Sequence, residues 1–437
     1  MEFHRLCVIG LGYIGLPTAS SFAAYGLKVL GVDNNPLVIS TIRNGGIHIN
    51  EPGLRMVVHE AIASGNLVVS EIPEPADAFI IAVPTPFFED ELGEYEGQSY
   101  RKADMRAVIS AIESIVPHLR QGNLVVLEST SPPRTTVDLV QPILERSGMK
   151  AGVDFYLAYS PERVLPGQIL RELLENARVI GGVNQPSAEA GRDLYACFVK
   201  SRIILSDATT AEMVKLMENT SRDINIAIAN EFSRLAQRFG IDVWEAIKIA
   251  NLHPRVNILN PGPGVGGHCI SVDPWFLVEA APDLTKLILT AREVNDSQPN
   301  FVLKLIQSVA GENLTGKHIA ILGIAFKPDV DDLRESPAIE VIKRLTQAGA
   351  IVSAYEPNKK DAEISDIKIT QSLQDAVVDA DLVVLLVAHR EFKELEPQKL
   401  RELTPARLLI DTVGCWAIQP WSEAGFILGR LGVGRNE

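Results

Sequence analysis

The residue best suited to chemistry is Cys269, which ends the glycine-dense stretch Gly262-Pro263-Gly264-Val265-Gly266-Gly267-His268-Cys269. Glycines let a backbone pass close to a ligand and leave a thiol accessible, so this setting favours a reactive cysteine. An accessible thiolate can act as a covalent nucleophile. The alternative is a buried, inert thiol beside loop glycines. That interpretation is favoured for the other cysteines, which lie in apolar surroundings: Cys7, Cys197 and Cys415.

Three further polar residues are singled out by their spacing. Lys215 and Asn219 stand four residues apart in a predicted helix and therefore on the same face of it. Taken alone, a pair of this kind more often consists of solvated side chains. Asp273 follows Cys269 by four residues.

A second motif near the N-terminus predicts a dinucleotide site. Gly10-Leu11-Gly12-Tyr13-Ile14-Gly15 follows a predicted strand and opens a predicted helix, and Asp33 ends the next strand. This context distinguishes the dinucleotide fingerprint from a simple glycine turn, which is the alternative. A carboxylate at Asp33 would bind ribose hydroxyls and repel a 2′-phosphate, and Asn34 and Asn35 follow it instead of arginine. NAD is therefore favoured over NADP.

The elements that position these motifs begin with buried strands. Residues 6–9, 28–32, 78–83 and 124–127 are rich in Val, Ile and Leu without polar alternation. Such runs are typical of strands that are buried on both faces of a parallel sheet.

A long helix is predicted in the middle of the chain. Thr209-Thr210-Ala211-Glu212 fits a capping box, and neither Pro nor Gly interrupts the sequence before Gly240. Met213, Leu216 and Met217 are its expected inward side chains. A helix of about thirty residues would be about 45 Å long, enough to connect domains and to form a dimer surface.

The third region repeats the pattern of the first. Residues 317–323 resemble residues 5–10, and residues 381–387 resemble residues 78–83, but the second copy lacks Gly-x-Gly-x-x-Gly. We therefore predict an α/β fold with two Rossmann-like, doubly wound domains, joined by a central helical domain with a long connecting helix. The expected domains are residues 1–206, 207–310 and 311–437.

Composition excludes several classes of protein. The net charge of −14 argues against a nucleic-acid partner, which would require clustered Lys and Arg. The four cysteines form no Cys-x-x-Cys pair, so neither a metal site nor a disulfide framework is expected. A reducing cytoplasm fits these thiols. No apolar run has the length of a membrane span, and no membrane partner is expected.

The ordered motifs together resemble the UDP-glucose/GDP-mannose dehydrogenase family along nearly the whole chain. The matching segments are residues 10–17, 83–87, 128–132, 160–167, 211–225, 253–259, 262–276, 325–328 and 334–337. The resemblance implies that the first domain binds NAD, that the central domain dimerises and carries the catalytic loop, and that the third domain binds a UDP-sugar. It also implies a homodimer or higher homo-oligomer.

Site residues are implied by position in the resemblance. The implied catalytic residues are Cys269 as the nucleophile, Lys215, Asn219 and Asp273 around the reacting carbon, and Glu162 and Thr130, which position water. The implied cofactor contacts are Gly10, Gly12, Tyr13, Ile14, Gly15, Asp33, Pro84, Thr85, Thr130 and Arg334. The implied substrate contacts are Glu162, Arg163, Val164, Lys215, Asn219, Arg255, Asn257, Gly266 and Lys327, with Arg255 donated across a dimer.

The implied reaction is a four-electron oxidation of a sugar C6 alcohol to a carboxylate by two NAD, through a thiohemiacetal and a thioester on Cys269. Residues 253–259 and 273–276 favour UDP-N-acetyl-D-mannosamine as the substrate, for surface polysaccharide synthesis, with UDP-N-acetylglucosamine or UDP-glucose as alternatives. A two-electron hydroxyacid dehydrogenase would explain Lys215 and Asn219, but neither the glycine loop nor the third domain. An inactive NAD-binding protein would not require this set of side chains.

Overall fold

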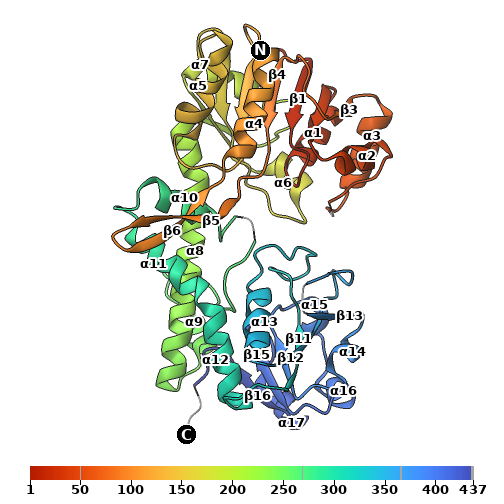
Figure 1. Ribbon diagram of the computed structural model, residues 1–437, viewed down its shortest axis with the longest axis vertical. Coiled ribbons are helices and arrows are strands. Elements are labelled where there is room, and N and C mark those ends of the chain that lie inside the picture. The colour runs from red at the N-terminus through yellow and green to blue at the C-terminus, as the bar shows by residue number, and fades with distance from the viewer. Residues whose placement is uncertain (50, 268, 365–366, 435–437) are drawn as a thin grey trace. The chain divides into compact units, whose positions relative to one another are not determined.

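The computed structural model describes residues 1–49, 51–267, 269–364 and 367–434. The chain divides into two compact units, whose elements are labelled in Figure 1. Unit 1 consists of Met1–Glu218 and Trp275–Leu284, and unit 2 consists of Asn219–Pro274 and Thr285–Glu437. The division into three domains after residues 206 and 310 stays a prediction.

Unit 1 contains an eight-stranded sheet with strand order β10-β9-β8-β7-β4-β1-β2-β3. Neighbouring strands are parallel except β8 and β9, which are antiparallel. The strands are β1 (Arg5–Ile9), β2 (Lys28–Val32), β3 (Leu67–Ser70), β4 (Ala78–Ile81), β7 (Leu124–Leu127), β8 (Tyr156–Tyr159), β9 (Arg178–Gly182) and β10 (Ile203–Asp207). The four predicted strands are confirmed, although β4 ends at Ile81 and not at Val83.

Helices cover both faces of this sheet, so its strands are buried on both sides. In β1, Leu6 and Val8 pack into one hydrophobic cluster, whereas Cys7 and Ile9 pack into another on the opposite face. This placement confirms why the strands read as continuous apolar runs. The helices of unit 1 are α1 (Gly15–Ala24), α2 (Pro36–Arg43), α3 (Leu54–Ala63), α4 (Arg106–Ile115), α5 (Gln141–Leu144), α6 (Ile169–Glu175) and α7 (Gln185–Tyr195), with short helical turns η1 (Val116–His118), η2 (Thr136–Val140) and η3 (Glu145–Ser147).

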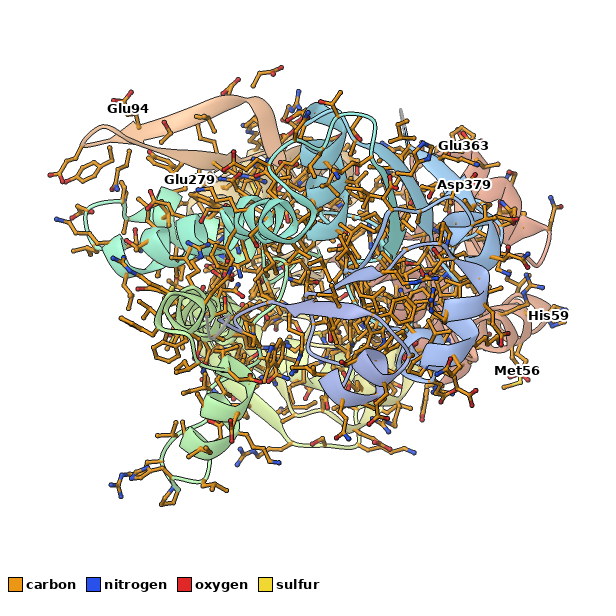
Figure 2. The ribbon with its side chains drawn as sticks, turned by 90° about the horizontal axis from the view of Figure 1, so that it is seen from below. Met56, His59, Glu94, Glu279, Glu363 and Asp379 are labelled. Carbon is orange, nitrogen blue, oxygen red and sulfur yellow. The ribbon has the colours of Figure 1, made fainter. Side chains whose placement is uncertain are left out.

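An antiparallel hairpin of β5 (Phe87–Tyr95) and β6 (Gln98–Ala103) extends from unit 1. The amide of Ala103 donates to Glu279 at 2.9 Å, and the rings of Phe87 and Phe276 lie 5.5 Å apart. Glu279 and Phe276 belong to α10 (Asp273–Ala280). Figure 2 shows Glu94 on the outer part of the hairpin, away from Glu279. The hairpin was not predicted, because its strands are polar and carry no apolar alternation.

The long central helix is confirmed as α8 (Ala208–Phe239), with 32 residues, and it ends before Gly240, whose φ is +72°. The predicted capping box is wrong. Asp207 caps the helix, accepting from the Thr210 amide at 2.9 Å and from its hydroxyl at 2.6 Å. Glu212 is fully buried and accepts from the amide and hydroxyl of Thr136 at 2.8 and 2.6 Å. A buried carboxylate requires such partners, so tertiary contacts override the local cap.

Unit 2 contains a six-stranded parallel sheet with strand order β13-β12-β11-β14-β15-β16. Its first strand lies between its second and fourth strands, as in unit 1, which confirms the predicted repeat of the architecture. The strands are β11 (His318–Leu322), β12 (Ile351–Tyr355), β13 (Lys368–Thr370), β14 (Leu382–Leu385), β15 (Leu408–Asp411) and β16 (Ile427–Arg430).

The helices of unit 2 are α9 (Val243–Ala250), α11 (Lys286–Asp296), α12 (Gln298–Ala310), α13 (Pro337–Gln347), α14 (Leu373–Val377), α15 (Arg390–Lys393), α16 (Pro397–Leu403) and α17 (Ile418–Glu423). Among the described residues, every helix is too short or too polar to span a lipid bilayer.

Candidate functional site

The glycine turn after β1 has the geometry that a dinucleotide needs. Gly10 has a φ of +91°, and a Cβ there would lie 2.5 Å from the carbonyl oxygen of Ala82. A Cβ on Gly15 would lie 1.8 Å from the carbonyl oxygen of Gly10, whereas Gly12 faces open space. The first turn of α1 carries no acidic residue and no side-chain cap. Its N–H groups can therefore bind an anionic pyrophosphate.

Asp33 is placed to bind a ribose beside this turn. It follows β2, and its carboxylate accepts from the amides of Leu11 and Asn35, both at 2.9 Å. These two bonds hold the carboxylate against the glycine turn and leave acceptor capacity for ligand hydroxyls. The strand–turn–helix context of the fingerprint is thus present in the structure.

Two loops at the carboxyl ends of β4 and β7 complete this part of the site. The hydroxyl of Thr85 donates to the carbonyl oxygen of Thr130 at 2.7 Å. The hydroxyl of Ser129 donates to the carbonyl oxygen of Val83, also at 2.7 Å. The structure thereby brings together Pro84, Thr85 and Thr130, at the edge where open α/β sheets bind ligands.

Lys215 and Glu162 form the second group of predicted site residues in unit 1. Lys215 lies on α8, and its Nζ donates to the carbonyl oxygen of Glu162 at 2.8 Å. Only 7% of Lys215 and 9% of Glu162 is exposed. Asn219, one turn further along the helix, is also 9% exposed. The interpretation of Lys215 and Asn219 as solvated side chains is therefore wrong, and Met217, which we expected to face inward, is exposed.

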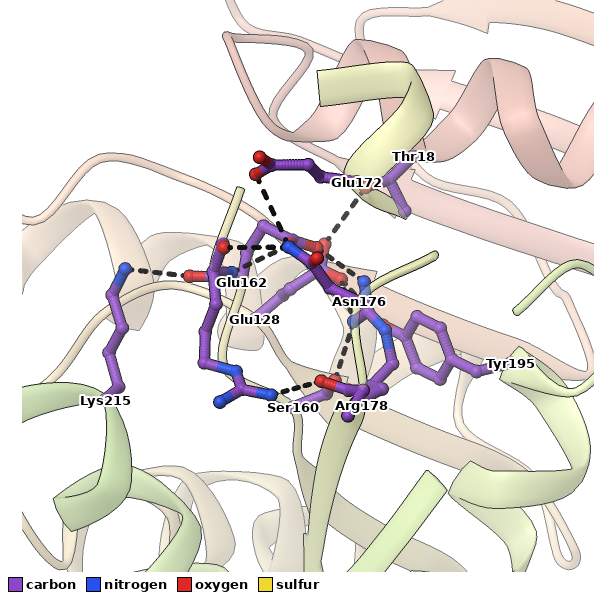
Figure 3. A network of polar contacts seen from close by, with 11 residues as sticks. Thr18, Glu128, Ser160, Glu162, Glu172, Asn176, Arg178, Tyr195 and Lys215 are labelled. Atoms are coloured by element: carbon purple, nitrogen blue, oxygen red, sulfur yellow. Dashed lines mark hydrogen bonds and ion pairs between the residues drawn. The ribbon is translucent and has the colours of Figure 1, made fainter. Parts of the chain in front are cut away.

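A buried arginine holds the Glu162 side chain in place (Figure 3). Arg178, at the start of β9, donates to Glu162 at 2.5 Å, to Ser160 at 2.8 Å and to Glu128 at 3.2 Å. Its guanidinium stacks 4.2 Å from the ring centroid of Tyr195, whose hydroxyl donates to Glu128 at 2.8 Å. Sequence reasoning missed Arg178, because its partners come from separate strands and helices.

This network contains two carboxylates and one guanidinium, all buried. Burial raises the pKa of Glu128 to about 7. The positive charge of Arg178 opposes this rise, and the negative charge of Glu162 adds to it. Glu162 has the shorter contact with Arg178, so Glu128 is the carboxylate that is left with less compensation. Glu128 therefore takes up a proton near neutral pH. Thr18 of α1 contacts the same carboxylate at 3.4 Å.

The remaining catalytic candidates lie in unit 2. Cys269 is exposed, and its carbonyl oxygen accepts from the amides of Val272 and Asp273 at 3.1 and 2.8 Å. These bonds form the turn that leads into α10. The side chain of Asn219 donates to Asp273 at 2.5 Å, and Asp273 is 1% exposed. The structure thus groups Asn219, Cys269 and Asp273 in unit 2. In unit 1 it groups Glu162 with Lys215, and Thr130 with Thr85.

The other three cysteines are unsuited to nucleophilic chemistry. Burial raises the pKa of Cys7 to about 12, that of Cys197 to about 11 and that of Cys415 to about 12. A thiol with so high a pKa contributes almost no thiolate at neutral pH. This result agrees with the prediction that these cysteines are inert.

The glycines before Cys269 have a structural role in unit 2. A Cβ on Gly266 would lie 2.5 Å from the carbonyl oxygen of Glu335, and a Cβ on Gly267 would lie 2.8 Å from the ring of Phe326. Gly267 also has a φ of +85°, and its amide donates to the carbonyl oxygen of Arg334 at 3.3 Å. The loop therefore requires glycine because it packs directly on another backbone segment of unit 2.

The other predicted ligand contacts are placed as follows. Arg255 and Asn257 are exposed on a loop whose base is clamped by Asn251, which exchanges two hydrogen bonds with the backbone of Ile258 at 2.9 and 2.7 Å. Lys327 is half-buried. Arg334 forms an ion pair with Asp332, and Arg163 forms one with Glu218. Val164 is partly buried and packs against the core of unit 1.

Three successive parts of the chain match three domains of one family. Residues 4–199 match the NAD binding domain of the UDP-glucose/GDP-mannose dehydrogenase family, residues 209–297 its central domain, and residues 320–418 its UDP binding domain. These matches occur in order and cover most of the chain.

Relatives match over the whole chain. A UDP-N-acetyl-D-mannosamine dehydrogenase of Methanocaldococcus jannaschii is 48% identical over 435 residues, which is 99% of this chain and 97% of the relative. An NDP-N-acetyl-D-galactosaminuronic acid dehydrogenase of Ralstonia solanacearum is 45% identical over 427 residues, 95% of this chain and 97% of the relative. The solved UDP-N-acetyl-mannosamine dehydrogenase of S. aureus is 43% identical, with a TM-score of 0.88 and coverage of 98% and 99%. The protein therefore belongs to the UDP-glucose/GDP-mannose dehydrogenase family of NAD-dependent oxidoreductases.

Proposed function

We propose that the protein oxidises the C6 alcohol of UDP-N-acetyl-D-mannosamine to a carboxylate, at the expense of two NAD, to supply a uronic acid for surface polysaccharide synthesis. The observation that carries this proposal is the exposed thiol of Cys269, four residues before Asp273. Asp273 is buried and accepts a hydrogen bond from the buried Asn219. A single two-electron oxidation of an alcohol would not need a nucleophile. Relatives with this sugar in their names support the choice of substrate.

The chain supplies a base for the first proton transfer and a nucleophile for the covalent step. The glycine turn and Asp33 would hold NAD, which would supply the hydride acceptor for both oxidations. Asp273 takes the C6 hydroxyl proton in the first oxidation, which leaves an aldehyde. The Cys269 thiolate then adds to the aldehyde carbon and forms a thiohemiacetal. Loss of its hydroxyl proton and of the second hydride gives a thioester.

Hydrolysis releases the product and regenerates the thiol. Glu162 and Thr130 position a water molecule, which attacks the thioester carbon, and Cys269 leaves as the thiolate. Lys215 and Asn219 donate to the oxyanion at the reacting carbon; one such donor contributes roughly 3 kcal/mol to transition-state stabilisation. The net change is one alcohol and one water converted to a carboxylate, with four electrons accepted by two NAD.

The stoichiometry of NADH per sugar tests this function directly. UDP-N-acetylmannosamine, UDP-N-acetylglucosamine, UDP-N-acetylgalactosamine and UDP-glucose are each supplied in limiting amount with excess NAD. Two NADH per UDP-N-acetylmannosamine are expected, with carboxylate as the product. The galacto sugar is the second candidate, because a relative with 45% identity carries its uronic acid in its name. One NADH per sugar for every substrate would rule out the four-electron reaction.

We further propose that a second copy of the chain covers an apolar stripe on α8. Ile228, Phe232, Leu235 and Phe239 recur at helical spacing and are all exposed, with Phe239 70% exposed. A contiguous row of this kind on one helix face is typical of a protein interface. The occupant is a second copy because the stripe lies on α8, the helix that we expect to form a dimer surface. In addition, the family resemblance implies that Arg255, on the loop that follows α9, acts across a dimer.

Placing two lysines in the stripe is expected to separate the dimer. The double substitution Phe232→Lys and Leu235→Lys introduces two charges that would be desolvated in the interface, so sedimentation velocity should change from dimer to monomer. The control is Met56→Lys, which changes a more exposed apolar residue on α3 of unit 1 (Figure 2). An unchanged dimer in the double variant would contradict the proposal.

A further inference from the structure

The second Rossmann-like sheet repeats the backbone turn of the first. In unit 1 the amide of Gly10 donates to the carbonyl oxygen of Val32 at 2.8 Å. In unit 2 the amide of Gly323 donates to the carbonyl oxygen of Tyr355 at 2.9 Å, and Gly323 likewise has a positive φ, of +83°. Each pair joins the end of the first strand to the end of the second. The residues after Val32 and Tyr355 therefore occupy equivalent places.

Those residues are Asp33 and Glu356, and both are carboxylates. Asp33 accepts from the amide of Leu11 at 2.9 Å, and Glu356 accepts from the amide of Ile324 at 2.8 Å. Asp33 is partly exposed, whereas Glu356 is fully buried. The position that can bind a ribose in unit 1 is therefore closed to a ligand in unit 2.

His389 is the residue that closes it. Its Nε2 lies 3.0 Å from Glu356, and the imidazole is 1% exposed. The backbone amide of Asp329 donates to its Nδ1 at 2.9 Å, so Nδ1 is unprotonated and Nε2 carries the proton. Burial alone would raise the pKa of Glu356, but the hydrogen bond from His389 and those from backbone amides hold that pKa below its usual range.

The pair holds both ends of a six-residue loop. Glu356 accepts from the amides of Ile324 and Ala325 at 2.8 and 3.0 Å, and His389 accepts from the amide of Asp329. Asp329 has a left-handed φ of +60°, which is disfavoured for a residue with a Cβ unless its surroundings hold it.

The centre of this loop reaches the catalytic segment of the same unit. The loop centre contains Phe326 and Lys327. A Cβ on Gly267 would lie 2.8 Å from the ring of Phe326, so the ring packs directly against Gly267. Gly267 stands two residues before Cys269. An unbroken series of direct contacts therefore runs from the buried carboxylate to the glycine loop.

We propose that Glu356 and His389 are positioning residues, which hold the loop of Phe326 and Lys327 and, through Phe326, set the backbone of the glycine loop before Cys269. The second Rossmann-like domain thus uses its fingerprint carboxylate to position a loop, not to bind a dinucleotide. The roles of Lys327 and Cys269 in this inference rest on the proposed function; the positioning itself does not.

Hydrogen exchange in the full-length protein tests the positioning without any ligand. In His389→Ala, amides of residues 324–329 and of residues 266–267 are expected to exchange at least about tenfold faster, while residues 8–12 and 31–35 keep their rates. The matched control is Ser353→Ala, which removes a partly buried hydrogen bond to Ala376 from β12, the strand that ends just before Glu356. Unchanged exchange in both segments, or a uniform increase across unit 2 in both variants, would overturn the proposal.

A binding measurement separates this inference from the proposed function. In His389→Ala, the Kd for UDP is expected to rise at least about tenfold, whereas the Kd for NAD stays within about twofold because Asp33 is untouched. If the wild-type protein binds no UDP, the proposed function fails, and the exchange experiment still decides the positioning. If His389→Ala does not fold, Glu356→Gln provides the same test, since a neutral acceptor weakens the charge-assisted hydrogen bond from His389 and keeps an acceptor for the amides.

Discussion

Replacing Cys269 by alanine is expected to lower the rate of carboxylate formation by at least roughly 10⁴-fold, the scale seen when a covalent nucleophile is removed. Without the thiol, the aldehyde has no acceptor with which to form a thioester, so the second oxidation stops. The first oxidation requires only the base and NAD. With enzyme in excess over sugar, absorbance at the NADH maximum should therefore show at most one NADH per UDP-sugar.

The control for this result is Cys415→Ala, which removes a thiol whose pKa burial raises to about 12. This variant should keep the wild-type rate. Iodoacetamide at about pH 8 should alkylate Cys269 and leave the high-pKa thiols unmodified, and the modification should abolish turnover. Two NADH per sugar at near wild-type rate in Cys269→Ala would show that the oxidation does not pass through a thioester on this residue.

Replacing Arg178 by methionine is expected to lower the free energy of unfolding by roughly 3–5 kcal/mol, because it leaves buried carboxylates without their counter-charge. Arg178 is the one cation in the network of Figure 3 that contacts both Glu128 and Glu162. Methionine keeps much of the apolar volume, so loss of charge dominates over loss of packing. Urea denaturation followed by circular dichroism measures the effect.

The matched variant Glu128→Gln should not lower the free energy of unfolding at alkaline pH, in contrast to Arg178→Met. In the folded protein Glu128 keeps its proton up to about pH 7, whereas the unfolded chain releases it near 4.5. The native state thus binds more protons between these values, and stability falls as pH rises through that window. Glutamine removes this fall, so the variant should be at least as stable as the wild type at about pH 8.

Combining the two substitutions gives the sharpest check. Arg178→Met with Glu128→Gln leaves one buried carboxyl group without its cation, whereas Arg178→Met alone leaves two. The double variant should therefore be more stable than the single arginine variant. A pH profile of stability in Glu128→Gln that matches the wild type, or a double variant that loses the sum of both single effects, would refute the assignment of the proton to Glu128.

The sequence by itself determined the features that depend on neighbouring residues. The apolar runs predicted four strands of the first sheet because strands buried on both faces carry no polar alternation. The glycine spacing followed by Asp33 predicted the turn, since only glycine accepts the φ and the close approach found at Gly10 and Gly15. The length of α8 followed from an uninterrupted helical sequence that ends at Gly240.

Only the tertiary structure decided which polar side chains are buried and with what partners. Lys215 reads as a solvated lysine in the sequence, but the fold buries its ammonium against the carbonyl oxygen of Glu162. Glu212 reads as part of a capping box, but its carboxylate satisfies a loop 76 residues away. Arg178 and His389 gave no local signal, because a buried charge or imidazole is stabilised by groups that are remote along the chain. Local pattern thus predicts the backbone, and the burial of polar groups depends on contacts that only folding creates.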